Sequence, residues 1–299
     1  MTDHVLTLIA AARDGLAAET VDAIADALRH LGADVGRPDW LAPGTACDVP
    51  FAELNDDQAD AAARALLGDA PVDVLAQPTA ERRKRLLIAD MESTLIENEM
   101  LDELADYVGK RQEIARITAR AMNGELDFRG ALDARVKLLA GLGENVLDES
   151  AKLIRYMPGA RALVATMQAN GARTAIVSGG FRCYTALVAR ELGVDREFGN
   201  MLEVKRGKLT GRVVPPVLGR EAKLETLVRL AAEASLPLAA TLATGDGAND
   251  LDMIGAAGLG VAFRAKPIVA GKAKWRITYG DLTALLYAQG YRAGEIVAA

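Results

Sequence analysis

This sequence contains little cysteine or histidine, with two residues of each type among 299. Cys47 and Cys183 are too few for a disulfide framework, so we expect a reducing compartment and a cytoplasmic protein. His30 lies in an amphipathic helical pattern and His4 lies near the start of the chain, so we expect both to be structural. A Ser-His-Asp triad, a histidine nucleophile and a histidine-rich metal site are therefore disfavoured.

Long apolar runs and basic clusters are also missing. No apolar run approaches the ~18 residues that a membrane-spanning helix needs. The first four residues do not begin a basic stretch followed by an apolar one, so no signal peptide is expected. The formal net charge is -6 and Lys and Arg are scattered, which argues against a nucleic-acid surface. A chain of 299 residues is long enough for two or three domains.

The first 80 residues carry a strand and helix pattern of their own. Apolar runs predict strands at 5–10, around 33–35, at 47–51 and at 72–76, and helical periodicity predicts helices at 19–31 and 56–67. The resulting order β-α-β-β-α-β is the split βαβ arrangement, and it resembles the small regulatory domains of the ACT type. Residues 78–85 are expected to form a linker, in which the basic run 82–85 is solvated.

From residue 86 onward, strands and helices alternate. Short, wholly apolar runs at 86–89, 174–177, 241–244 and 259–263 are typical of buried parallel strands, with helices at 160–170 and 222–234 between them. This pattern predicts an α/β, Rossmann-like core with an open parallel sheet. A helix-rich insert at about 98–150 could form a cap, and 202–214 reads as a β-hairpin. The predicted domains are thus 1–80 and 81–299.

Polar residues follow three of the apolar runs, at the point where each predicted strand ends. Ligands of open α/β sheets bind beyond the carboxyl ends of the strands, so these residues are candidates for one site. In chain order they are Asp90, Glu92, Ser178, Gly179, Gly180, Asp246, Asn249 and Asp250.

The composition of this group favours a metal-assisted phosphate site. Its four carboxylates would repel one another without a cation, and carboxylate oxygens with water are the ligands that Mg²⁺ prefers. Ser178 and the neighbouring glycine amides could donate to phosphate oxygens, and Lys223 would complete the charge balance. Alone, an Asp after a strand is often a helix cap, and a Gly-Asp-Gly segment is usually only a turn. The three motifs in this order and spacing favour chemistry.

The joint pattern resembles the haloacid dehalogenase (HAD) superfamily of phosphohydrolases, and within it the phosphoserine phosphatase family. The motifs that carry the resemblance are Asp-Met-Glu-Ser-Thr at 90–94, Ser-Gly-Gly at 178–180, Lys223, and Gly-Asp-Gly-Ala-Asn-Asp at 245–250. Stretches at 98–104, 135–139, 177–181 and 207–211 are similar to the same family. The catalytic resemblance covers about 86–291, and the N-terminal pattern fits the bacterial form with an extra ACT-like domain.

The resemblance implies hydrolysis of O-phospho-L-serine, the last step of serine biosynthesis, through an aspartyl-phosphate on Asp90. The implied catalytic residues are Asp90, Glu92, Ser178 and Lys223. The implied Mg²⁺ ligands are Asp90, the Glu92 backbone carbonyl, Asp246 and Asp250. The implied substrate-binding residues are Glu99, Met122, Phe128, Arg135, Ser178, Gly179 and Asn249. In this scheme Glu99 pairs with the substrate ammonium, Arg135 holds its carboxylate, and the insert closes over the site.

Glu92 departs from the family pattern, which has Asp two residues after the nucleophile. The resemblance gives this position the role of protonating the leaving serine oxygen and then activating water. Glutamate has the same chemistry but one more methylene group. Because a misplacement of ~1 Å can cost on the order of 100-fold in rate, we expect retained but slowed or differently tuned turnover.

Other functions fit the sequence less well. A cysteine phosphatase needs five residues between Cys and Arg, and Arg190 lies one residue too far from Cys183. The glycines at 255–260 run into a strand and do not open a helix, which disfavours a nucleotide-binding loop. A phosphatase for another small phosphomonoester and a non-catalytic amino-acid sensor weakened by Glu92 both stay open. The partners expected are a small-molecule substrate and a second copy in a homodimer, without nucleic acid or membrane.

Overall fold

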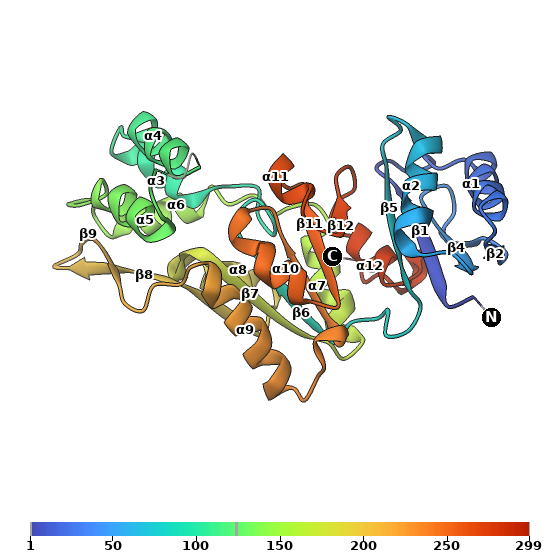
Figure 1. Ribbon diagram of the computed structural model, residues 1–299. Helices are drawn as coiled ribbons and strands as arrows, with labels where there is room; N and C mark the ends of the chain where they lie inside the picture. Colours follow the sequence, from blue (N-terminus) through green and yellow to red (C-terminus); the bar gives the residue numbers. More distant parts are fainter. Residues whose placement is uncertain (1, 123–124, 299) are drawn as a thin grey trace.

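The computed structural model describes residues 2–122 and 125–298, and no side-chain description is given for residues 121 and 122. Two separate β-sheets form the frame of the molecule. The N-terminal sheet lies at one end, the larger sheet occupies the middle, and a group of helices lies at the other end (Figure 1). Among the described residues, no helix combines the length and apolar character that crossing a bilayer requires.

The N-terminal module, residues 4–78, has the predicted element order with one extra strand. Its elements are β1 (His4–Ala10), α1 (Ala18–His30), β2 (Asp34–Val35), β3 (Asp39–Ala42), β4 (Ala46–Ala52), α2 (Asp56–Leu67) and β5 (Val72–Pro78). The antiparallel sheet runs β2-β4-β1-β5, and β3 pairs with β4. Leu6, Leu8 and Val74 face α1 and α2, while alternate residues such as Ile9 and Leu75 pack into the main core. Both faces of this sheet are therefore covered.

The second sheet is the predicted Rossmann-like α/β core. Its strands are β6 (Leu86–Ala89), β7 (Arg173–Phe181), β8 (Arg196–Lys205), β9 (Lys208–Val214), β10 (Thr241–Gly245), β11 (Leu259–Phe263) and β12 (Trp275–Ile277). They are ordered β12-β11-β10-β6-β7-β8-β9. All neighbouring pairs are parallel except β8 and β9, which form the hairpin. Because β6 lies between β10 and β7, the ends of the three motif-bearing strands meet at one edge.

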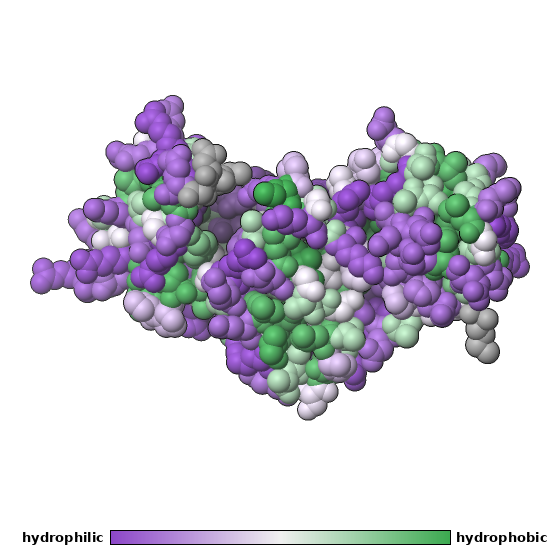
Figure 2. Space-filling model, viewed as in Figure 1, coloured by the Kyte–Doolittle hydropathy of each residue, from purple (hydrophilic) through white to green (hydrophobic). Residues whose placement is uncertain are grey.

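Helices cover both faces of the core sheet. They are α7 (Ala160–Ala169), α8 (Arg182–Leu192), α9 (Arg220–Glu233), α10 (Leu251–Ala256), α11 (Pro267–Ala270) and α12 (Ala284–Ala288), with short 3-10 turns η1 (Leu238–Ala240), η2 (Ala248–Asp250) and η3 (Ala293–Glu295). Apolar surface gathers over α9 and α10 in the view of Figure 2, while hydrophilic residues dominate the N-terminal module and the opposite end of the molecule.

The predicted helix-rich insert is present between β6 and β7. It consists of α3 (Met100–Tyr107), α4 (Arg111–Met122), α5 (Phe128–Lys137) and α6 (Asn145–Ala151). We call these four helices the helical insert. After α5, the Gly141 N–H donates to the Leu209 carbonyl and the Leu209 N–H donates to the Leu142 carbonyl, so the insert is bound to the hairpin strand β9.

The expectation of a solvated basic linker is wrong for two of its residues. Arg82 donates to Asp48 of the N-terminal sheet and to the Ala288 carbonyl of α12. Lys84 is 6% exposed, and its ammonium donates to the carbonyls of Glu81 and Ala239. Buried cations of this kind need partners, and the junction between the two sheets supplies them. Composition alone could not reveal this because the partners come from distant parts of the chain.

Candidate active site

A cluster of three buried carboxylates lies at the predicted sheet edge. Asp90 follows β6, Asp246 follows β10, and Asp250 closes η2. One oxygen from each side chain lies within 4.8 Å of the others. β6 and β10 are adjacent parallel strands, in which Ala89 pairs with Thr244, so their first polar residues must end side by side. The backbone N–H of Asp90 donates to the Thr244 carbonyl, which extends this pairing to the carboxylates.

Lys223 of α9 is enclosed by this cluster. Its ammonium lies 2.7 Å from Asp90 Oδ2 and 2.6 Å from Asp250 Oδ1, and the side chain is only 1% exposed. Burial alone would lower the pKa of Lys223, but the two carboxylates outweigh it and raise that pKa. The lysine is therefore held as a cation, and one cation among three carboxylates leaves an excess of negative charge.

Asp246 is the carboxylate of the cluster that does not pair with Lys223. Burial, followed by the charge of Asp90, raises the pKa of Asp246 to about 7. The nearest cation is Lys266, whose ammonium lies 3.8 Å from Asp246 Oδ2 and is half exposed. Burial also raises the pKa of Asp250, to about 6, although Lys223 opposes this shift. Converging oxygens that lack sufficient positive charge fit a divalent cation with hard, oxygen-ligand preferences.

Glycine at position 245 is required by the close packing of this cluster. A Cβ atom there would lie 2.3 Å from Asp250 Cγ. Asp250 is further fixed by the Gly247 backbone N–H, which donates to its Oδ2 at 2.9 Å. Asn249 is half-buried on the same turn. The Gly-Asp-Gly-Ala-Asn-Asp segment therefore packs its own carboxylate under the strand end, in addition to reversing the chain.

The Glu92 side chain extends away from the three carboxylates and lies between the start of α3 and Gly180. Its Oε1 accepts a 2.8 Å hydrogen bond from the Met100 backbone N–H at the start of α3. A Cβ atom on Gly180 would lie 2.7 Å from Glu92 Oε2, so the absence of a side chain at 180 makes room for the longer acid. Burial and the nearby carboxylates of Glu99 and Asp90 raise the pKa of Glu92 to about 8.

Ser178 and Gly179 lie where β7 leaves the sheet. Ser178 is 1% exposed, and its Oγ accepts a 3.0 Å hydrogen bond from the Gly180 backbone N–H. The Gly179 carbonyl accepts from Asn200 Nδ2 at 2.8 Å. The same Asn200 side chain is bonded to both polar groups of the Leu218 backbone, just before the helix that carries Lys223. Asn200 thus ties the loop at Ser178 to the helix of Lys223.

The helical insert supplies the residues predicted to contact substrate. A Cβ atom on Gly179 would lie 3.1 Å from Phe128 Cζ, so the ring lies against this loop. Glu99 accepts from Ser93 Oγ at 2.8 Å. Arg135 is half-buried and donates to the Ala131 carbonyl at 3.2 Å. The predicted contribution of Met122 falls on a side chain outside the described residues.

Two residues near the cluster escaped the sequence analysis. Asn200 follows Arg196–Phe198, the part of β8 that is parallel to β7, and this part is polar, so the search for apolar runs passed over it. Lys266 lies three residues beyond the end of β11, a strand that was identified but whose following residues were not examined. Examining the residues after every strand, including the polar ones, would have found both.

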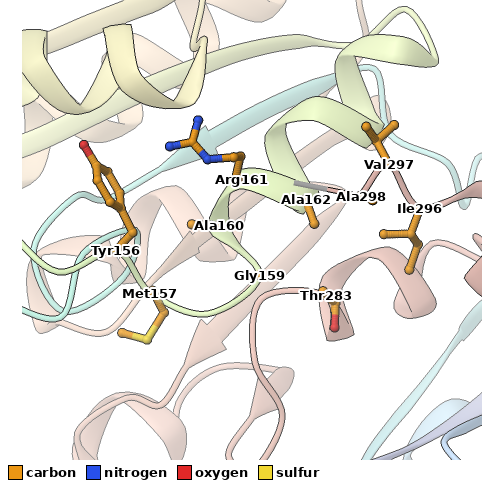
Figure 3. A pocket seen from close by; sticks show the side chains of 10 residues that line it. All are labelled: Tyr156, Met157, Gly159, Ala160, Arg161, Ala162, Thr283, Ile296, Val297 and Ala298. Atoms are coloured by element: carbon orange, nitrogen blue, oxygen red, sulfur yellow. The ribbon is translucent and has the colours of Figure 1, made fainter.

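A groove outside this cluster has a different composition. A cavity of about 370 Å³ is lined by the start of α7, Thr283 and the C-terminal segment, including Tyr156 and Ile296 (Figure 3). Arg161 is the only charged side chain among the residues labelled there. The lining of this groove includes none of the cluster carboxylates, so the strand-end cluster remains the candidate site.

Comparison with known proteins identifies the family of this chain. Residues 87–254 match the family model described as haloacid dehalogenase-like hydrolase. A phosphoserine phosphatase of Streptomyces coelicolor is 41% identical over 288 residues, which are 95% of this chain and 70% of that protein. The phosphoserine phosphatase SerB2 of Mycobacterium tuberculosis is 44% identical, over 74% of this chain but only 54% of its own length.

A solved structure extends the similarity to almost the whole chain. The unliganded crystal structure of a probable phosphoserine phosphatase from Vibrio cholerae superimposes with a TM-score of 0.78 and 30% sequence identity. The match covers 98% of this chain and 88% of that one, so it includes the N-terminal module and the α/β core together.

Proposed function

This chain belongs to the haloacid dehalogenase-like hydrolase family and, within it, to the phosphoserine phosphatases, and we propose that it hydrolyses O-phospho-L-serine to L-serine and phosphate. The observation that carries this proposal is the strand-end cluster. It combines the Asp90 carboxylate, a buried lysine whose ammonium lies 2.7 Å from it, and the Ser178 hydroxyl on the neighbouring strand. These are the parts that in-line phosphoryl transfer to a carboxylate requires.

Asp90 is the proposed nucleophile. A carboxylate oxygen of Asp90 forms a bond to phosphorus, and the bond from phosphorus to the serine oxygen breaks, which leaves an aspartyl-phosphate. The departing oxygen takes a proton from Glu92. Glu92 then accepts a proton from a water molecule, whose oxygen attacks the aspartyl-phosphate and releases phosphate and free Asp90. The Lys223 ammonium, 2.7 Å from Asp90 Oδ2, balances the charge of this carboxylate.

Mg²⁺ is the proposed cofactor. Asp90, the Glu92 backbone carbonyl, Asp246 and Asp250 would hold it. When bound, it would neutralise charge on the phosphate and on the carboxylates. The raised pKa of Asp246 supports this assignment, since the carboxylate lies where a further cation is favourable. Asn249, half-buried on the same turn, would orient the surrounding groups.

The remaining predicted residues would bind and enclose the substrate. Ser178 and the Gly179 amide would donate to the equatorial phosphate oxygens. Glu99 would pair with the substrate ammonium and Arg135 with its carboxylate. Phe128, packed against Gly179, would exclude water from the reacting groups. The predicted role of Met122 in enclosing the substrate stays a prediction.

We also propose a division of the chain into an ACT-like domain at 1–80 and a phosphatase domain at 81–299, with the cap at about 98–150. The separate sheets and the order β2-β4-β1-β5 support the division. A homodimer and a cytosolic location complete the proposal. They rest on the resemblance and on the scarcity of cysteine.

A panel of phosphomonoesters with Mg²⁺ tests the proposed function. Phosphate release from O-phospho-L-serine should exceed release from sugar phosphates, and Asp90→Asn should abolish both turnover and the phosphoenzyme. Asp252→Asn, the same change at an exposed carboxylate paired with Arg220, is the matched control and should keep full activity. Equal activity on unrelated sugar phosphates would favour a general phosphatase, and substantial turnover by Asp90→Asn would exclude this nucleophile.

A further inference from the structure

Asp73 of β5 reaches across the junction between the two sheets. Its side chain belongs to the N-terminal module and is 1% exposed. Its Oδ1 accepts from the Thr278 backbone N–H at 2.7 Å, and its Oδ2 accepts from the Gly280 backbone N–H at 2.8 Å. The Tyr279 N–H lies between them, 3.2 Å from Oδ2. One carboxylate therefore fixes three successive amides in the turn after β12, the last strand of the core sheet.

The same turn is bonded to the loop that follows β11. The Gly280 carbonyl accepts a 3.1 Å hydrogen bond from Arg264 Nε. The Arg264 backbone N–H donates to the Ile277 carbonyl at 2.7 Å. Arg264 has a φ of 42°, a left-handed conformation that costs free energy for a side chain other than glycine. Contacts on both sides of the turn are thus needed to keep this backbone in place.

The loop held in this way ends at the carboxylate cluster. Two residues after Arg264, the Lys266 backbone N–H donates to the Asp246 carbonyl at 3.3 Å. The Lys266 ammonium lies 3.8 Å from Asp246 Oδ2. A continuous chain of contacts therefore runs from Asp73, through Gly280 and Arg264, to the loop that contacts Asp246.

We infer that Asp73 is a positioning residue for the carboxylate cluster, acting through the 278–280 turn and Arg264 on the loop that presents Lys266 to Asp246. The N-terminal module is then a structural part of the active site as well as a candidate regulatory domain. Figure 1 shows how this is possible, since β12 and α12 lie between the N-terminal sheet and the rest of the core. The consequence for turnover rests on the proposed function, but the consequence for the loop does not.

Asp73→Asn tests this inference. The amide keeps one acceptor oxygen but replaces the other with an N–H donor, so one of the Thr278 and Gly280 backbone N–H groups would face a donor and lose its acceptor. In protein stripped of metal, deuterium exchange should rise on the order of 10-fold in the turn at 277–281 and in the loop at 264–270. Turnover of phosphoserine should fall on the order of 10-fold or more, because the cluster is displaced.

Asp48→Asn is the matched control. Asp48 is also a buried carboxylate of the N-terminal sheet, and it pairs with Arg82 across the same junction, but neither residue contacts the turn. This variant should leave exchange at 264–270 unchanged. Equal loosening of that loop in both variants, or none in Asp73→Asn, would overturn the inference. Absence of phosphoserine turnover in the unsubstituted protein, with the exchange result intact, would instead refute the proposed substrate.

Arg264→Met keeps the inference testable if Asp73→Asn does not fold. It removes the donor to Gly280 and leaves the Asp73 contacts in place. Exchange should rise at 264–270 while the amides of 278–280 stay protected. In the double variant, the loss of turnover should be no greater than in the more impaired single variant. If the fold-losses of turnover in the two single variants multiplied in the double variant, Asp73 and Arg264 would act independently. Unchanged exchange at 264–270 in Arg264→Met would lead to the same conclusion.

Discussion

Lys223 and Asp250 form an ion pair of 2.6 Å in which both side chains are almost completely buried. Asp90 shares the same ammonium at 2.7 Å. Removing one partner of a buried ion pair leaves an uncompensated charge, which is more costly than the pair is favourable. The lysine therefore stabilises the fold of the cluster in addition to its proposed role in charge balance.

The first prediction concerns this lysine. Lys223→Met should lower the free energy of unfolding by about 3–5 kcal/mol in the presence of a chelator, because the buried carboxylates lose their cation. Urea denaturation measures this change. Lys152→Met is the control, since that lysine is exposed and pairs with Glu149 at the surface, where pairs are worth ~0–1 kcal/mol. Equal stability of the two variants would show that the cluster does not depend on Lys223.

The second prediction concerns pH and metal removal. The pKa of Asp246 is raised to about 7, so the fold favours its protonated form. Stability from this group is fully present below the unfolded value of 3.8 and is lost as the pH rises through about 7. Metal-free protein should thus become less stable over this window, and Mg²⁺ should restore stability at the upper end by binding the ionised form.

Asp246→Asn isolates that contribution. Urea denaturation with chelator should show that the free energy of unfolding falls less with rising pH in the variant than in the unsubstituted protein. The difference should be about 1.4 kcal/mol for each unit by which the pKa of Asp246 is raised. The variant should also lose most of the stabilisation by Mg²⁺. Identical pH dependence in the two proteins would mean that burial and the charge of Asp90 do not raise the pKa of Asp246.

The third prediction concerns the longer acid. Glu92→Asp should withdraw the carboxylate from the Met100 N–H and from the space over Gly180. A displacement of ~1 Å should lower turnover on the order of 100-fold. Glu92→Gln keeps the length but removes the acid, so it should slow both the formation and the hydrolysis of the phosphoenzyme, and quenched-flow kinetics with intact-protein mass spectrometry measure the two steps. Unchanged turnover in Glu92→Asp would show that the site is not built around glutamate.

The fourth prediction concerns Asn200. Asn200→Ala removes the bonds to Gly179 and Leu218 and leaves partly buried backbone groups without their partner, so the free energy of unfolding should fall by about 1–3 kcal/mol. Its effect on kinetics should exceed that of an equally destabilising change elsewhere, with a higher KM because the Ser178 loop is released. Asn170→Ala, which removes a bond to the Thr166 carbonyl in α7, provides the comparison.

The fifth prediction concerns substrate choice. Arg135→Met should erase the preference for phosphoserine over phosphoethanolamine, which lacks the carboxylate. Glu99→Gln should erase the preference over 3-phosphohydroxypropionate, which lacks the ammonium group. Each lost charged contact corresponds to about 2–5 kcal/mol of discrimination when the partner is left buried. kcat/KM for the three esters measures both effects. If Arg135→Met instead erased the preference that depends on the ammonium group, and Glu99→Gln the one that depends on the carboxylate, the two assignments would be reversed.

The local elements of the fold were largely predictable. The apolar runs at 86–89 and 259–263 became β6 and β11 with the same bounds, because short buried strands have a distinct composition. β12 and the parallel half of β8 were not predicted. Their residues are polar or mixed, and they become strands only because a neighbouring strand offers hydrogen bonds.

The sequence by itself predicted polar groups at the ends of three separate strands, which carry Asp90, Ser178 and Asp246, and the tertiary structure made these strands neighbours. Only the tertiary structure decided how the rest of the chain supports them. Lys84 and Arg82 are buried by partners that lie far away in sequence. Asp73 reaches the core because a second sheet packs against it. Local patterns carry strand and helix preferences, whereas burial and charge pairing depend on contacts between distant segments.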